Sequence, residues 1–406
     1  MIRHYLKLIW NRKRSNLLIM VEIFLSFLVT FAVVTLGIHA ADNYRRPLGY
    51  VWQDVWNVQV DTRAGNLGER GDKTPPELLE TARQVFAAIR EFPEVAAAGA
   101  ASCPPYGFSE WNSSANLGKW ELRYGLNLVT DGFADAMRLE LTAGRFFDAE
   151  DDGAAWVPVV VTERLAAEVF GGGTAVGNSI PQEKNRDGSI DPELRIVGVV
   201  RDFRQDGEFA TPRNYLFQRH RLDDDKRRPP DNVLVRLRPG TTAAFEERLV
   251  KRLQAVAPAW SFEVKPLEQM RETRFTMVLG PMIATAVIAG FLLLMVGMGL
   301  TGVLWQTVTQ RTREIGLRRA KGATARDIRT QIFGELVVMT SVAVLAGTAI
   351  ALQFPLLKLS GLINNGVYLV SLVVSAACIY LLTMACAWYP SRMATTVSPA
   401  EALHYE

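Results

Sequence analysis

The sequence is poor in the residue types that most chemical sites need. Its 406 residues include three cysteines and four histidines, and no two histidines share a spacing suited to metal binding. Cys378 and Cys386 fall in an apolar run, and Cys103 stands alone in a soluble-like stretch. These residues provide no disulfide framework, CxxC metal site or Ser-His-Asp set, so Cys103 is expected to be a small buried residue.

Signatures of nucleotide chemistry are also missing. No Gly-x-x-x-x-Gly-Lys-Ser/Thr sequence occurs, so these residues provide no P-loop. The glycine-rich run 171–177 lacks dinucleotide-binding spacing. Lys and Arg number 45 and Asp and Glu number 42, so the net charge of +3 creates no general attraction for nucleic acid. We expect no catalysis, no bound cofactor or metal, and no nucleic-acid partner.

What the sequence does contain is four apolar stretches long enough to cross a membrane. At about 1.5 Å per helical residue, about 20 residues cross a hydrocarbon core of roughly 30 Å. The predicted transmembrane helices are 17–40, 276–306, 335–357 and 366–388. A cleaved signal peptide is the alternative for the first stretch, but that stretch is too long and a poor cleavage site follows it. Residues 1–16 interleave basic and apolar side chains and predict an amphipathic helix at the cytosolic membrane surface.

Residues 41–275 contain no membrane-spanning stretch and have the pattern of a soluble α+β domain. Helical periodicity occurs in residues 76–90 and again around 245–256. Strand-like runs lie at 56–60, 95–101, 157–161, 194–200, 232–237 and 260–264. The alternation of helices with strands suggests small βαβ units. The predicted fold is therefore four membrane helices with a large α+β domain inserted between the first and second.

The connector between the second and third spans, residues 307–334, is basic and predicts two helices joined by a corner. Glu314 and Arg318 are spaced for an i,i+4 ion pair. Gly322 is predicted to end the first helix with a positive φ. Thr324, with Asp327 three residues later, predicts a capping box that starts the second helix.

The distribution of basic residues predicts the orientation in the membrane. Lys and Arg cluster in the N-terminal segment and in the connector, whereas the turn between the third and fourth spans carries only Lys358. By the positive-inside rule, the connector and both termini, including the tail 389–406, are expected in the cytosol. The α+β domain is then expected on the outside of the membrane.

The stretch Arg311-Thr-Arg-Glu-Ile-Gly-Leu-Arg-Arg-Ala-Lys-Gly-Ala323 resembles the signature of the FtsX/MacB-type permease domain of ABC transporters. The ending Val397-Ser-Pro-Ala-Glu-Ala-Leu403 is similar to the C-terminal ending of that family. Several phrases also resemble the MacB-like periplasmic core domain, namely residues 92–95, 141–147, 161–171, 177–180 and 196–203. Together the resemblance covers nearly the whole chain.

The resemblance implies a non-catalytic permease subunit in the inner membrane. It also implies a separate cytosolic ATPase that binds ATP and Mg. When that ATPase hydrolyses ATP, the permease is expected to transmit the movement to its periplasmic domain. A second permease copy or a paralogue is an expected partner, because four spans are few for a conduit. A periplasmic adaptor and an outer-membrane channel are further candidate partners. The implied C-terminal motif is Pro399, Glu401, Ala402 and Leu403. The implied ATPase-coupling residues are Arg313, Glu314, Ile315, Gly316, Arg318, Arg319, Lys321, Gly322 and Ala323.

Two alternatives stay open at this point. Small residues allow close helix approach, and they serve either packing within the four spans or a dimer interface. These residues are Gly290, Ala343, Gly347 and Ala351.

The function is either export or extraction of a substrate, or that of an ATPase-coupled scaffold or receptor that regulates a periplasmic enzyme or senses a ligand. Nothing in the sequence selects a substrate.

Overall fold

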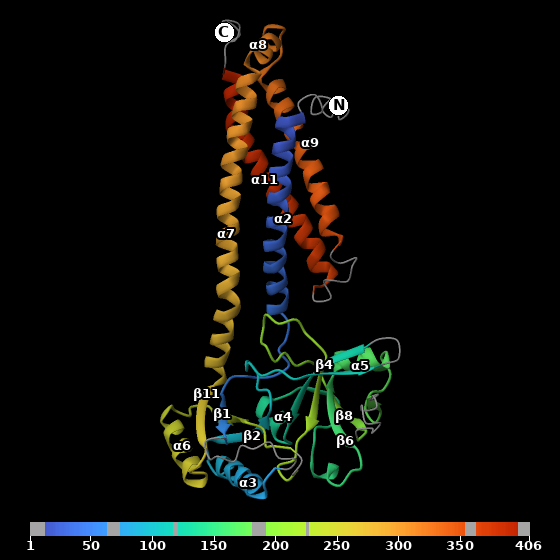
Figure 1. Ribbon diagram of the computed structural model, residues 1–406, viewed down its shortest axis with the longest axis vertical. Coiled ribbons are helices and arrows are strands. Elements are labelled where there is room, and N and C mark those ends of the chain that lie inside the picture. Colours follow the sequence, from blue (N-terminus) through green and yellow to red (C-terminus); the bar gives the residue numbers. More distant parts are fainter. Residues whose placement is uncertain are drawn as a thin grey trace. The chain divides into compact units, whose positions relative to one another are not determined.

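The structure, a computed structural model, divides into two units (Figure 1). The membrane-helix unit comprises residues 1–42 and 279–406, and the α/β unit comprises residues 43–278. The structure describes residues 13–62, 74–116, 121–180, 192–224, 227–353 and 363–396. Most of the predicted N-terminal amphipathic helix, residues 1–12, and all of the C-terminal motif lie outside these ranges.

Four long apolar helices make up most of the membrane-helix unit, and each is long enough to cross a bilayer. Their bounds are α2 Lys13–Tyr44, α7 Leu267–Gln310, α9 Ala325–Ala351 and α11 Asn365–Thr396. The first two flank the α/β unit in the chain, so the predicted fold class is confirmed. Within this unit the ring of Phe31 lies edge-on to Tyr368, with centroids 5.2 Å apart.

All four helices extend beyond the predicted spans at one end or at both. Helix α7 begins at Leu267, inside the stretch assigned above to the α+β domain. Its first turns contain polar residues that form helices well, and a search for apolar runs does not detect them. Helix α11 continues through Pro390 as far as Thr396. Helix α9 starts at Ala325, so residues 325–334 of the connector are continuous with the third span in one helix.

The α/β unit is built on one sheet, and four strands at one end of it form two interlocked split β-α-β units. The strands are β1 Val55–Asp61, β2 Val95–Ala101, β10 Asn232–Leu237 and β11 Ser261–Pro266, in the order β11-β1-β10-β2. Each pair of neighbours in this order is antiparallel. Helices α3 (Pro76–Arg90) and α6 (Ala244–Val256) connect them, and their apolar faces are buried as the periodicity predicted.

The rest of the sheet is inserted between β2 and β10. Its order continues β4-β9-β6-β8-β5, with β3 on β4 and β7 on β8. Helix α5 (Glu163–Phe170) joins the parallel neighbours β6 and β8, so the predicted βαβ unit occurs once with adjacent strands. The β1-α3-β2 and β10-α6-β11 units each have a further strand between their parallel strands. The remaining bounds are β3 Asn112–Asn116, β4 Glu121–Val129, α4 Phe133–Met137, β5 Leu141–Gly144, η2 Ala149–Asp151, β6 Val157–Thr162, β7 Ser179–Ile180, β8 Leu194–Val200 and β9 Tyr215–Arg219.

Candidate functional site

The connector has the predicted helix–corner–helix form. Helix α8 (Thr312–Ala320) ends before Gly322, whose φ of +97° lies in the left-handed region that favours glycine. Helix α9 begins with the predicted capping box, in which the Asp327 amide donates to Thr324 Oγ1 and the Thr324 amide donates to Asp327 Oδ2. Hydrogen bonds from Thr324 lower the pKa of the Asp327 carboxyl. The corner is therefore fixed by backbone geometry on one side and by a cap on the other.

A chain of five polar side chains joins α8 to α9 and to the end of α7. Glu314 pairs with Arg318 at 2.6 Å, which confirms the predicted i,i+4 pair, and Arg318 donates to Gln331. The Gln331 amide donates to Glu335 at 3.0 Å, and Glu335 pairs with Arg311 at 2.6 Å. We call this set, Arg311, Glu314, Arg318, Gln331 and Glu335, the connector polar chain.

The inner end of the connector polar chain is largely removed from solvent. The side chains of Arg311 and Glu335 are only 13% and 10% exposed. A cavity of about 40 Å³ lies beside them, lined on other sides by Ile315, Leu336 and Met339 among other residues. In such a setting a charge pair is held firmly, because either partner alone would be buried without compensation.

The opposite face of α8 is exposed. Arg313, Leu317 and Lys321 follow one another at intervals of four residues and so lie on one helical face. Leu317 is 51% exposed, between these two cations. Ile315 and Gly316, in contrast, are buried, and Ile315 packs against Ile328 of α9. The predicted coupling residues thus divide into an inward set that fixes the connector and an outward set that another molecule can reach.

Sequence reasoning missed three members of this site. Arg311, Gln331 and Glu335 were not among the candidate residues, although they carry the buried end of the polar chain. Arg311 and Glu335 are separated by 24 residues, so no local spacing reveals their contact. Leu317 was missed as well, and an exposed leucine between two cations was the available signal.

The candidate packing residues behave in two ways. A Cβ added to Gly347 would lie 2.4 Å from the Phe27 ring, so α9 and α2 approach closely at this glycine. Ala343 and Ala351 on the same helix are also buried. These three residues therefore pack within the chain. A Cβ added to Gly290 would meet no atom of the described residues within 4 Å, so no described part of the chain covers the face of α7 at that glycine.

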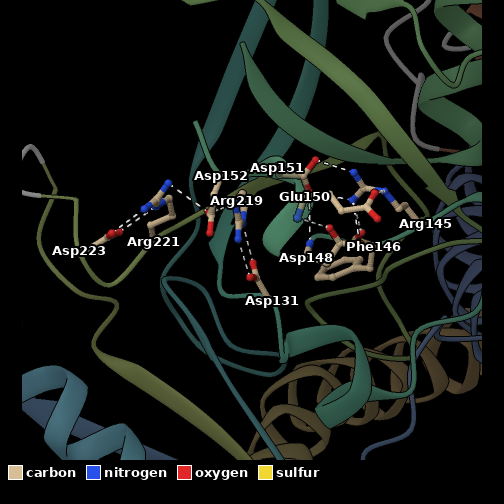
Figure 2. Close-up of polar contacts among 10 residues, drawn as sticks. All are labelled: Asp131, Arg145, Phe146, Asp148, Glu150, Asp151, Asp152, Arg219, Arg221 and Asp223. Carbon is tan, nitrogen blue, oxygen red and sulfur yellow. Dashed lines mark hydrogen bonds and ion pairs between the residues drawn. The ribbon is translucent and has the colours of Figure 1, made fainter. Parts of the chain in front are cut away.

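In the α/β unit, Figure 2 shows arginine–carboxylate pairs that link the end of β9 to the residues that follow β4 and η2. Arg219, at the end of β9, donates two hydrogen bonds of 2.7 Å to Asp131 and one of 2.8 Å to Asp152. Arg221 pairs with Asp152 at 3.1 Å and with Asp223 at 2.5 Å. Every carboxylate in this row faces an arginine, so the row is a structural crosslink rather than a reactive site.

A second group in Figure 2 holds η2 in place. Arg145 makes two hydrogen bonds, of 2.7 and 2.8 Å, to the buried carboxylate of Asp151. Burial acts to raise the pKa of Asp151, but the hydrogen bonds from Arg145 and from the Asp148 amide lower it overall.

Elsewhere in this unit Cys103 is fully buried, as predicted, and burial raises the pKa of its thiol.

A junction of buried hydrogen bonds fixes the points where α2 ends and α7 begins. Arg204, which is 2% exposed, donates to the carbonyl oxygens of Asn43 and Arg46 at 2.9 and 3.0 Å. Its other amino group donates to the carbonyls of Glu208 and Ala210. The carboxylate of Glu208 in turn pairs at 2.5 Å with Arg271 in the second turn of α7.

Two family models match this sequence. The MacB-like periplasmic core domain matches residues 17–252, and the FtsX-like permease C-terminal domain matches residues 286–399. The uncharacterized ABC transporter permease YvrN of Bacillus subtilis is 25% identical over 100% of this chain and 99% of its own length.

Other relatives are longer than this chain. The macrolide export ATP-binding/permease protein MacB of Bdellovibrio bacteriovorus is 27% identical over 65% of this chain, and the match covers 41% of that protein. The corresponding protein of Agrobacterium fabrum is 29% identical over 68% of this chain and 43% of its own length. The crystal structure of the periplasmic region of MacB from Actinobacillus actinomycetemcomitans aligns with 57% of this chain and 96% of that chain, at 13% identity and a TM-score of 0.36.

Proposed function

This chain belongs to the MacB/FtsX-type family of ABC transporter permeases, and we propose that it couples ATP hydrolysis, on an ATPase outside these 406 residues, to movement of its α/β unit. It is a multi-pass membrane protein with four apolar helices. Its sequence contains no P-loop, so the proposal assigns ATP and Mg to the partner.

The observation that carries the proposal is the two-sided construction of α8. Its outward face presents Arg313, Leu317 and Lys321, a combination that suits an apolar groove with acidic edges. Its inward side is tied by the connector polar chain to α7 and α9. A displacement of the docked partner would therefore pass to two membrane helices rather than dissipate in a loop.

The proposed orientation places the connector in the cytosol and the α/β unit in the periplasm, with the protein in the inner membrane. The support is the clustering of Lys and Arg in the connector and the N-terminal segment. Movement of α7 would then reach the α/β unit directly, because α7 is one continuous helix from Leu267 to Gln310. This is mechanotransmission, with energy delivered across the membrane.

For the biological output we propose export or extraction of a substrate. The names of the two MacB relatives refer to macrolide export, which supports export as the general activity of this chain without assigning its substrate. A second permease copy is proposed as a partner, because no described part of the chain covers the face of α7 around Gly290.

The proposal is tested by photo-crosslinking in the native host. Benzoylphenylalanine placed at Leu317 should capture a protein that mass spectrometry identifies as a P-loop ATPase. The control is the same residue placed at Glu80, on the exposed side of α3 in the α/β unit, which should capture none. Capture of no ATPase at Leu317, or equal capture at Glu80, would contradict the proposal.

A further inference from the structure

Three aromatic side chains meet where α2 ends and α7 begins. Tyr44 stacks on Phe209 with ring centroids 5.7 Å apart, and its ring lies edge-on to Phe275 at 6.1 Å. Phe209 and Phe275 lie 4.9 Å apart, and the Arg271 guanidinium lies 4.4 Å from the centre of the Phe275 ring. Tyr44 is nevertheless 51% exposed, so this cluster is not part of a closed core.

A fourth aromatic ring lies beside the next position on α7. Phe108, which is 67% exposed, is covered on one side by the Arg274 guanidinium at 4.7 Å. Arg274 also pairs with Asp206 at 3.0 Å and donates to the Tyr106 and Gly107 carbonyls, which holds the Phe108 loop against the helix. We call Tyr44, Phe108, Phe209 and Phe275 the aromatic collar.

Two residues of the aromatic collar, Tyr44 and Phe275, lie on membrane helices, so helix length gives their distance from the opposite end of each span. From Arg14 to Tyr44 in α2 is 30 residues, or about 45 Å of helix. From Trp305, which stacks on Tyr389 at 5.7 Å, to Phe275 in α7 is again 30 residues and about 45 Å. A bilayer with its headgroups is about 40–45 Å thick. Along each helix the distance from the far end of the span to the collar residue thus equals about one bilayer thickness.

The chemistry of the collar suits the headgroup layer of a bilayer. Aromatic side chains are enriched at membrane–water interfaces, where a ring can contact acyl chains while its polar neighbours stay hydrated. The cations behind the rings are already paired, Arg271 with Glu208 and Arg274 with Asp206. Attraction to the surface should therefore depend on apolar contact more than on anionic lipid, and high salt should change it little.

We propose that the aromatic collar is a lipid-binding surface by which the α/β unit contacts the headgroup region of the bilayer, with Phe108 as its most exposed tip. The inference uses the membrane-spanning character of α2 and α7 and does not depend on ATPase coupling. Its consequence is that an amphiphilic molecule in that leaflet would reach the α/β unit without crossing open water.

The test uses the full chain with its three cysteines replaced and bimane attached to a single new cysteine. Phe108→Cys and Tyr44→Cys are compared with Glu80→Cys on α3, in nanodiscs of zwitterionic lipid that contain a headgroup nitroxide. Bimane at both collar positions should be quenched at least threefold more than bimane at position 80, with little change at high salt. Quenching equal to that at position 80 would overturn the proposal, as would disulfide-linked dimers through position 108, which would identify a second copy as the occupant.

Discussion

The Nη1 atom of Arg311 lies 2.6 Å from a carboxylate oxygen of Glu335 and joins the end of α7 to the start of the third span. Both side chains are about nine-tenths buried. The Glu314–Arg318 pair on the same connector has the same length, but its side chains are 44% and 38% exposed. Two ion pairs of equal length thus lie in different dielectric surroundings.

This contrast predicts unequal costs of removal. Glu335→Ala should destabilise the membrane-helix unit by roughly 3 kcal/mol, because it leaves Arg311 buried and unpaired. Glu314→Ala should cost about 0–1 kcal/mol, because its pair is exposed to water. Thermal unfolding of the full chain in nanodiscs measures the difference, and equal shifts in melting temperature would refute it. The double variant Arg311→Met with Glu335→Leu should recover the melting temperature but not ATP-dependent function.

Gly322→Val should weaken ATPase recruitment while leaving membrane insertion intact. The φ of +97° at Gly322 costs a residue with a Cβ about 1 kcal/mol or more, so the corner would shift. Gly240→Val is a matched control, since Gly240 has a φ of +88° and open space around it but lies in the α/β unit. Co-purification of the ATPase provides the readout. Wild-type recruitment by Gly322→Val would show that the corner has no role in docking.

The proposed orientation predicts which cysteines react from outside the cell. Glu80→Cys on α3 should label with a membrane-impermeant maleimide once the outer membrane is permeabilised. Arg326→Cys on the exposed side of the connector should label only after lysis. The reverse pattern would place the connector outside and would exclude a cytosolic ATPase as its partner.

His220 predicts a loss of stability in acid. Its ring is 2% exposed, and neither ring nitrogen has a hydrogen-bond partner among the described residues. Burial, and then the charge of Arg227, lower its pKa to about 4, against the smaller opposing effect of Asp224. Between about pH 6.5 and 4 the unfolded chain therefore binds a proton that the folded chain does not.

Stability should accordingly be complete above pH 6.5 and fall by about 2–3 kcal/mol as the pH approaches 4. His220→Phe keeps a buried ring without the titration, so its melting temperature should fall less between pH 7 and 4.5. Thermal unfolding of the full chain over this pH range makes the comparison, and superimposable profiles would rule the effect out. The carboxyl of Asp151 does not interfere, because its pKa is lowered and its titration lies at more acid pH.

The sequence was most informative where local rules decide the structure. Apolar length predicted the four spans, and period-3.6 patterns predicted α3 and α6. Gly322 and the Thr324–Asp327 cap predicted the corner of the connector. Each of these features depends on residues within four positions of one another or on a single long run.

What sequence reasoning did not predict depends on distant partners. Strand β9 was missed because its sequence, Tyr215-Leu-Phe-Gln-Arg219, shows no strict alternation of apolar and polar residues. It is central because it lies between β4 and β6. The start of α7 was placed too late, because its first turns contact Glu208 and Asp206 rather than lipid. The Arg311–Glu335 pair brings together two helices, and helical periodicity alone does not determine which neighbour a helix will meet.

The pairing of β1 with β11 decides how the α/β unit responds to tension. Trp56 faces Pro266 and Asp61 faces Ser261, so the chain enters β1 and leaves β11 at the same end of the ladder. A force that separated α7 from α2 would break the hydrogen bonds between β1 and β11 one pair at a time, so the ladder would resist it only weakly. Arg204 donates to the carbonyls of Asn43 and Glu208, and Glu208 pairs with Arg271. These contacts link α2 to α7 and oppose their separation. If the proposed coupling moves α2 and α7 together, the β1–β11 ladder bears no load, and we expect the α/β unit to move as a rigid body.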